Sequence, residues 1–306
     1  MKRFKTISEF LQFNQMPKPD HPLISVIRVD SVKRAKTDEP VKPWSYDFYC
    51  IALKRVYNSQ TFQLKYGQLP YDFDEGIMSF AAPNQVISLA ARNTDEKIKQ
   101  SGWMLIIHPD FLWNTQLAKT IKQFGFWDYS VNEALFLSEK EEAILINIIE
   151  NIQRECHSSI DKFSKQIIVS QIESFLSYAD RFYHRQFITR EKNNHQILDR
   201  LETLLTGYFN SEDLITKGLP TVQYVADQLN LSPKYLSDLL RVLTEKTAQQ
   251  HIHDKLIEKA KEKLSVTELS VSEIAYDLGF KHLQSFSKLF KTKTNQSPLE
   301  FRAKFN

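Results

Sequence analysis

Histidine and cysteine, the residues best suited to metal or redox chemistry, are scattered along this chain. His21 and His108 lie far apart, each beside a proline. His251 and His253 are closer, but on a predicted helix residues i and i+2 do not share a face. Cys50 and Cys156 fit no metal or redox spacing. Because an oxidative metal site needs clustered histidines with a carboxylate, we expect no metal, no cofactor and no disulfide.

Motifs for phosphate transfer and nucleophilic catalysis are also missing from the sequence. The chain has only seven glycines, and none belongs to a glycine-rich phosphate loop or to a Gly-x-Ser-x-Gly element. A kinase or a hydrolase is therefore disfavoured, and we expect the protein not to be an enzyme.

Polar side chains that can hydrogen-bond to the base edges of DNA occur in two groups near the C-terminal end. Glutamine can pair with adenine, aspartate can accept from cytosine, and lysine can donate to guanine. The first group is Lys234, Ser237, Asp238 and Arg241. The second is Gln284, Ser285, Ser287 and Lys288, together with the apolar Leu283 at a neighbouring outward position. The basic residues at the edges of the second group suit phosphates, which position a protein without specifying a sequence; they are Lys281, His282, Lys291 and Lys293. For each residue alone, a solvated surface side chain is the alternative.

The elements that would position these side chains form an approximate internal repeat. Residues 222–231 align with 271–280, and residues 237–240 align with 287–290 one position further along. Each copy predicts a short helix, a turn and a second helix. Ala226 and Ala275 stand where the helices would cross closely, and Asn230 and Gly279 stand where the turn needs a positive φ.

The second helix of each copy has an apolar side that should pack inward, leaving its polar side for a groove. Ser232 and Pro233 supply an N-cap and a first-turn proline in copy one. The apolar residues are Leu236, Leu239 and Leu240 in copy one, and Phe286, Leu289 and Phe290 in copy two. A linker helix is predicted over 248–264, where five apolar residues share one stripe: Ile252, Leu256, Ile257, Ala260 and Leu264. At ~25 Å, it can hold the two helices about one DNA turn apart.

The N-terminal part predicts strands, then helices. Short β-branched or aromatic runs at 23–29, 48–53, 61–66, 77–80, 86–89 and 103–107 suggest an antiparallel barrel or sandwich. Aromatic residues that can line an effector pocket, or simply pack in the core, are Tyr66, Phe73, Phe80 and Trp103.

Two amphipathic helices are predicted next. Ser138 and Glu141 form a capping box at the start of the first, and the second covers about 161–185. The second helix carries an apolar stripe of Ile168, Ile172, Phe175, Leu176 and Ala179. The apolar stripes of both helices can pack on the barrel or on a second subunit. The polar stretch 191–194 is the expected linker. The predicted domains are thus 1–137 for sensing or dimerisation, 138–192 for the helical hairpin and linker, and 193–306 for the repeat.

The C-terminal residues resemble those of the AraC/XylS family of bacterial regulators. The resemblance is carried by Leu269–Phe280, Gln284–Lys291 and Ser297–Arg302 and covers about residues 200–306. It implies two helix-turn-helix units that bind DNA, and a cupin-like N-terminal barrel, to which Gly76–Pro83 is similar. The fold class is then α+β: a cupin-like antiparallel β-barrel with a helical hairpin, followed by an all-α domain. Asn295 replaces the family's usual glycine and Glu245 is its counterpart, so the first copy is expected to close differently.

The sequence therefore predicts a cytoplasmic, DNA-binding transcriptional regulator. Residues 216–306 hold 14 Lys/Arg against 10 Asp/Glu, an excess that favours an anionic partner. Expected partners are double-stranded DNA, a small-molecule effector of unknown identity, a second copy of the chain and RNA polymerase, with no membrane association. The alternatives are a metal-dependent cupin enzyme fused to a helical domain, and a passive interaction protein.

Overall fold

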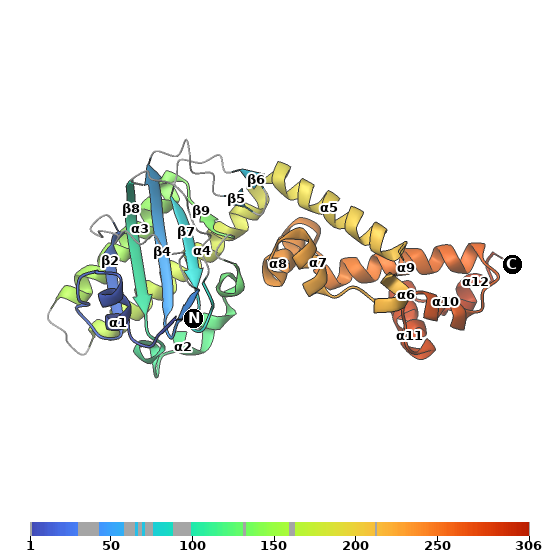
Figure 1. Cartoon of the computed structure of the whole chain (residues 1–306), viewed down its shortest axis with the longest axis horizontal. Coiled ribbons are helices and arrows are strands. Elements are labelled where there is room, and N and C mark those ends of the chain that lie inside the picture. Colours follow the sequence, from blue (N-terminus) through green and yellow to red (C-terminus); the bar gives the residue numbers. More distant parts are fainter. Residues whose placement is uncertain are drawn as a thin grey trace. The chain divides into compact units, whose positions relative to one another are not determined.

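The computed structural model describes residues 2–29, 43–57, 65–66, 69–70, 76–87, 99–130, 133–158, 163–211 and 213–305. The chain divides into two compact units, Met1–Gln186 and Phe187–Asn306, which we call the N-terminal unit and the C-terminal unit. Both are drawn in Figure 1. Within these ranges, no helix combines the length and the apolar character that crossing a membrane requires.

The N-terminal unit combines strands with helices. Its strands are β1 (Lys2–Phe4), β2 (Ile24–Arg28), β3 (Trp44–Tyr46), β4 (Tyr49–Tyr57), β5 (Lys65–Tyr66), β6 (Leu69–Pro70), β7 (Ile77–Ala81), β8 (Lys99–Ile107) and β9 (Leu135–Phe136). Its helices are α1 (Ile7–Phe13), α2 (Leu117–Thr120), α3 (Glu139–His157) and α4 (Ser164–Thr189), with 3-10 turns η3 (Pro109–Leu112), η4 (Ile121–Gln123) and η5 (Gly125–Asp128). The boundary between the units falls inside α4.

A five-stranded antiparallel sheet organises the N-terminal unit, in the order β2-β8-β4-β7-β9. Strands β1 and β3 pair in parallel, and β5 pairs with β6. Among the described residues, β2 and β9 are not paired with each other, so the sheet is open there. The predicted cupin-like barrel is not confirmed, and the predicted strands 61–66 and 86–89 lie partly outside the described residues.

Successive side chains along a strand point to opposite faces of the sheet, and here both faces are apolar. On one face, Cys50 and Ile106 join Phe10 of α1 in a buried cluster. On the other, Ile51 and its cross-strand neighbour Phe80 are buried, and the Phe80 ring packs on η5 and α4. Both faces of the sheet are therefore covered, one by α1 and β3 and the other by η5 and α4; the helices are labelled in Figure 1.

Helices α3 and α4 confirm the predicted amphipathic helices. Ser138 caps α3, and with Glu141 it completes the predicted capping box. On α4, Ile168 is 4% exposed and Ile172 is 0% exposed. The stripe therefore packs on its own unit, which decides between the two alternatives that the sequence left open. An Arg55–Glu142 ion pair joins β4 to α3, with contacts of 2.7 and 2.5 Å.

The polar break that the sequence predicts at 191–194 is not observed. These residues begin helix α5 (Glu191–Phe209), and the only break after α4 is at Arg190, with φ −90° and ψ 45°. Asn194 explains the difference, because its buried side-chain amide donates to the carbonyl oxygen of Phe187 at the end of α4. The polar residue that suggested a loop instead satisfies a carbonyl group at a helix end.

The regular elements in the described part of the C-terminal unit are helices, as the sequence predicts. After α5 come α6 (Asp213–Lys217), α7 (Val222–Leu229), α8 (Pro233–Thr244), α9 (Ala248–Val266), α10 (Val271–Asp277), α11 (Leu283–Thr294) and α12 (Pro298–Arg302). Helix α9 is the predicted linker helix, and its five-residue apolar stripe is buried. It contacts α5, α8, α10, α11 and α12, so it is the central element of the unit.

Candidate nucleic-acid interface

Two helix-turn-helix copies, α7–α8 and α10–α11, have matching turns. Asn230 has φ 59° and Gly279 has φ 77°, as the sequence predicts. The amide of Leu231 donates to the carbonyl of Ala226 at 2.9 Å, and Phe280 donates to Ala275 at 3.0 Å. Both alanines are fully buried at the helix crossing. The repeat in the sequence is therefore also a repeat in the backbone.

The ends of the second helices also match, which corrects one expectation. Glu245 after α8 has φ 60° and Asn295 after α11 has φ 58°, so the first copy closes like the second. The hydroxyl groups of Thr244 and Thr294 donate to the carbonyls of Leu240 and Phe290 at 2.7 and 2.8 Å. The same side-chain hydrogen bond thus precedes the left-handed residue in both copies.

The outward side of α8 carries both charge signs. Lys234 and Asp238 lie one turn apart and form an ion pair of 2.7 Å. Ser237 is half-buried between them, and Arg241 is exposed one turn further on. Opposite this side, Leu236, Leu239 and Leu240 are buried, as predicted. Because Asp238 engages Lys234, α8 presents donors with an acceptor rather than a uniformly basic surface.

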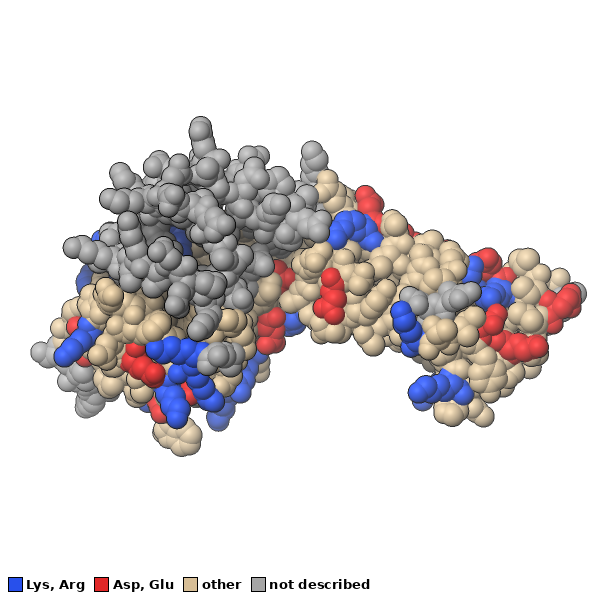
Figure 2. Space-filling view, viewed as in Figure 1, with Lys and Arg blue, Asp and Glu red and all other residues tan. Residues whose placement is uncertain are grey.

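The outward side of α11 is more basic. Gln284, Ser285 and Lys288 are exposed, whereas Leu283 and Ser287 are half-buried. The segment 281–294 holds four lysines and no acidic residue. In Figure 2, basic side chains project from the lower edge of this unit, where Figure 1 labels α11, while acidic ones gather at its right-hand end. On the opposite side Phe286 and Phe290 are fully buried, and Leu289 is half-buried rather than fully packed.

The residues that the sequence assigned to phosphate lie at both ends of α11. Lys281 and His282 precede the helix and are exposed. His282 is the N-cap residue, but its side chain makes no capping hydrogen bond. Lys291 is exposed in the last turn. Lys293, in contrast, turns towards α9 and forms an ion pair with Asp254.

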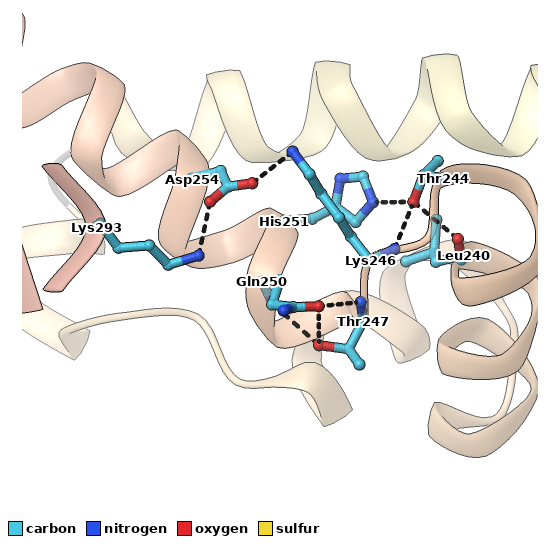
Figure 3. A network of polar contacts seen from close by, with 8 residues as sticks. All are labelled: Leu240, Thr244, Lys246, Thr247, Gln250, His251, Asp254 and Lys293. Carbon is cyan, nitrogen blue, oxygen red and sulfur yellow. Dashed lines mark hydrogen bonds and ion pairs between the residues drawn. The ribbon is translucent and has the colours of Figure 1, made fainter.

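A polar network joins the end of α8 to the start of α9 (Figure 3). Because the Thr244 hydroxyl donates to Leu240, it accepts from Nε2 of His251, 2.8 Å away. Burial lowers the pKa of His251, and nearby Lys246 lowers it further. Thr247 and Gln250 form a capping box at the first turn of α9. His251 thus joins the end of α8 to α9. Nε2 of His253 lies 2.8 Å from the Gln249 side-chain nitrogen on the same helix.

Sequence reasoning missed three features of this unit. Asp254 of α9 contacts Lys246 and Lys293, and nothing in its local sequence signals either partner. Gly279 lies so close to the end of α6 that an added Cβ would be 2.6 Å from the carbonyl oxygen of Leu214. The Thr244–Thr294 correspondence could have been found, because it extends the repeat at the same offset.

The predicted effector-pocket residues are only partly described. Phe80 and Trp103 are buried in the core of the N-terminal unit. Phe73 and the side chain of Tyr66 lie outside the described residues. The pocket role of all four stays a prediction.

Comparisons with known proteins agree with this geometry in the C-terminal unit. Residues 225–304 match the family model of a helix-turn-helix domain. An uncharacterized HTH-type transcriptional regulator in the cgkA 5'region of Pseudoalteromonas carrageenovora is 31% identical over 114 residues, covering 37% of this chain and 63% of that protein. The HTH-type transcriptional activator RhaS of Escherichia coli O157:H7 is 38% identical over 78 residues, covering 26% of this chain and 28% of RhaS.

Among solved structures, the C-terminal domain of the response regulator AraT from Geobacillus stearothermophilus is 30% identical, with a TM-score of 0.31, covering 35% of this chain and 84% of that one. The chain thus spans less than two thirds of the curated relatives above. With its matched turns, its repeated helix ends and this sequence similarity, the segment 225–304 is an AraC-type helix-turn-helix domain.

Proposed function

We propose that this chain is a sequence-specific DNA-binding transcriptional regulator. The observation that carries the proposal is the pairing of two helix-turn-helix copies of matching geometry. In each copy the second helix buries an apolar side and exposes polar side chains, as a helix that enters a major groove must. The family model of a helix-turn-helix domain matches residues 225–304, and the relatives reported above are named as transcriptional regulators.

In this proposal the recognition helices are α8 and α11. Gln284, Lys288 and Arg241 read base edges, since they are exposed and carry bidentate or strongly donating groups. Asp238 contributes selectivity rather than affinity, because its carboxylate repels phosphate. Lys234, Ser237, Leu283, Ser285 and Ser287 complete the groove-facing set. Lys281, His282 and Lys291 contact phosphates, and Lys293 can do so only by exchanging Asp254 for a phosphate.

The test is selection of bound sites from a random duplex pool by the full-length protein. We expect a defined site to be enriched, and binding to it to weaken as salt rises because bound counterions are released. A folded, full-length protein that enriches no sequence and shows no salt-sensitive binding would contradict the proposal.

For the N-terminal unit we propose sensing or dimerisation, in a cupin-like fold, as the family resemblance implies. A cavity of about 160 Å³ supports a sensing role; its lining includes His21, Leu23, Phe111, Cys156, Lys165 and Ile168. This volume suits a ligand of about one aromatic ring, as in engineered cavities of similar size. We place the protein in the cytoplasm, with RNA polymerase as a further expected partner.

A metal-dependent enzyme remains the competing class. In the described ranges, no three histidine, cysteine or acidic side chains lie close enough together to hold a metal ion. Metal analysis of protein purified without added metal distinguishes the two classes, because stoichiometric iron, zinc or manganese would favour the enzyme.

A further inference from the structure

One carboxylate in the C-terminal unit holds two lysines from different parts of the chain (Figure 3). Oδ2 of Asp254 accepts from Nζ of Lys246 at 2.8 Å, and Oδ1 accepts from Nζ of Lys293 at 2.9 Å. Although burial raises the pKa of Asp254, the hydrogen bonds from Lys246 and Lys293 lower it below its ordinary value. Asp254 therefore stays ionised at neutral pH and binds both ammonium groups.

The positions of these three residues give the contact its significance. Lys246 follows Glu245, the C-cap of α8, and Lys293 lies in the last turn of α11. Asp254 lies on α9, the helix that joins the two copies. A single side chain thus ties the C-terminal ends of both proposed recognition helices to the linker helix.

The backbone around Asp254 is well supported. Ala248, Ile252 and Leu256 of α9 are buried, and the Thr244–His251 hydrogen bond fixes the α8–α9 junction on the side of Lys246. Lys293 reaches Asp254 from a helix anchored by buried Phe290. Because α9 is held in this way, the Asp254 carboxylate has a fixed position to which the ends of α8 and α11 can both be bound.

We infer that Asp254 is a positioning residue that sets the separation of the two recognition helices and keeps Lys246 and Lys293 off the DNA phosphates. This inference rests on the proposed function. Two recognition helices joined rigidly fit only half-sites of one spacing. Without Asp254, the two ammonium groups lose their shared counter-charge, repel each other and become available to phosphate.

The first experiment measures tolerance to half-site spacing. Full-length protein and its Asp254→Asn variant bind the selected site and versions with one base pair inserted or removed between the half-sites. We expect the wild type to lose affinity about tenfold or more on the altered sites, and the variant to lose about threefold or less. Affinity for unrelated DNA should rise in the variant, and its salt slope should steepen by about one to two units.

Two matched controls separate positioning from net charge. Glu262→Gln makes the same change in charge, but Glu262 pairs with Lys259 within α9 itself. Asp277→Asn breaks a similar ion pair between α10 and Lys263 of α9, without touching the end of either recognition helix. Both controls should keep the wild-type spacing preference.

A second variant removes the contact from the other side. Lys246→Gln with Lys293→Gln should relax spacing preference as Asp254→Asn does, but without any steepening of the salt slope. If Asp254→Asn behaves like Glu262→Gln on the spacing panel, or the double variant keeps full discrimination, the inference is wrong while the proposed function stands. Absence of any binding by the wild type would overturn both.

Discussion

Gly279 lies directly against the carbonyl oxygen of Leu214, where an added Cβ would come within 2.6 Å of that oxygen. The turn of the second helix-turn-helix copy therefore needs glycine for two separate reasons. Its φ of 77° is unfavourable for residues with a side chain, and the end of α6 leaves no space for one. In the other copy, Asn230 has the positive φ but carries a side chain.

Replacing Gly279 with alanine should destabilise the C-terminal unit by more than the ~1–2 kcal/mol expected for the left-handed conformation alone. Asparagine, which tolerates a positive φ, should not restore stability, because its Cβ meets the same oxygen. Thermal unfolding of the three proteins checks this. Gly207→Ala is the control, since nothing lies within 4 Å of the added Cβ in helix α5; it should stabilise by about 0.5–1 kcal/mol. Full rescue by asparagine would show that only φ matters.

Substitutions at Gln284 and Lys291 should have different effects, because Gln284 is proposed to read a base and Lys291 to contact a phosphate. Gln284→Ala should cost about 1–3 kcal/mol on the best site and relax preference at one base pair, because a bidentate contact is lost. Lys291→Ala should weaken all sequences about equally and reduce the salt slope by about one unit. Binding to a panel of single-base variants at two salt concentrations distinguishes these effects. If Lys291→Ala reshapes the base preference while Gln284→Ala leaves it unchanged, α11 does not lie in the groove as proposed.

Removing Arg55 should reduce the stability of the protein more than removing the charge of Glu142. The Glu142 side chain is 3% exposed, whereas Arg55 is 42% exposed. Arg55→Met leaves a buried carboxylate without its partner and should cost about 3 kcal/mol. Glu142→Gln leaves a guanidinium that water can reach, so its cost should be smaller.

Urea unfolding of the full-length protein measures the difference. Arg3→Met is a suitable control, because it removes a similar arginine–aspartate pair with Asp47 from a more exposed position and should change stability little. Equal losses of unfolding free energy in Arg55→Met and Glu142→Gln would contradict the argument from burial.

Dimerisation, if it uses α4, must use other residues than Ile168 and Ile172. Exposed apolar side chains at the start of this helix include Ile167 (45%), and Phe163 (53%), which immediately precedes α4, lies four residues before it. Ile167→Asp should convert a dimer into a folded monomer, whereas Gln166→Asp, on the neighbouring exposed position, should not. Sedimentation at micromolar concentration provides the measurement, and a wild-type protein that is monomeric with and without DNA would rule out the dimer.

Much of the C-terminal unit could be predicted from the sequence because its determinants are local. The positive φ of Asn230 and Gly279 and the N-cap at Ser232 each depend on a few neighbouring residues. Glu245 shows the limit of residue-type reasoning, since it adopts the left-handed conformation that glycine or asparagine prefers. The structure of the helices on either side of Glu245 outweighs the free-energy cost of placing its side chain in this conformation.

The apolar stripe of α4 illustrates a different limit. Periodicity predicted that Ile168, Ile172 and Ala179 share a face, and they do. It did not identify what that face packs against, because a 3.6-residue period describes only the helix itself. The polar stretch 191–194 was misread for a related reason: Asn194 makes its hydrogen bond to a residue of the preceding helix.

The sequence by itself determined the two helix-turn-helix copies, their linker helix and the sides of α8 and α11 that carry polar residues. These features follow from spacing, capping and backbone preferences within about one or two turns of chain. Only the tertiary structure decided that Lys293 pairs with Asp254 and that Gly279 abuts Leu214. Such contacts join residues that are distant in the chain, so they depend on how buried side chains pack the helices together rather than on any local preference.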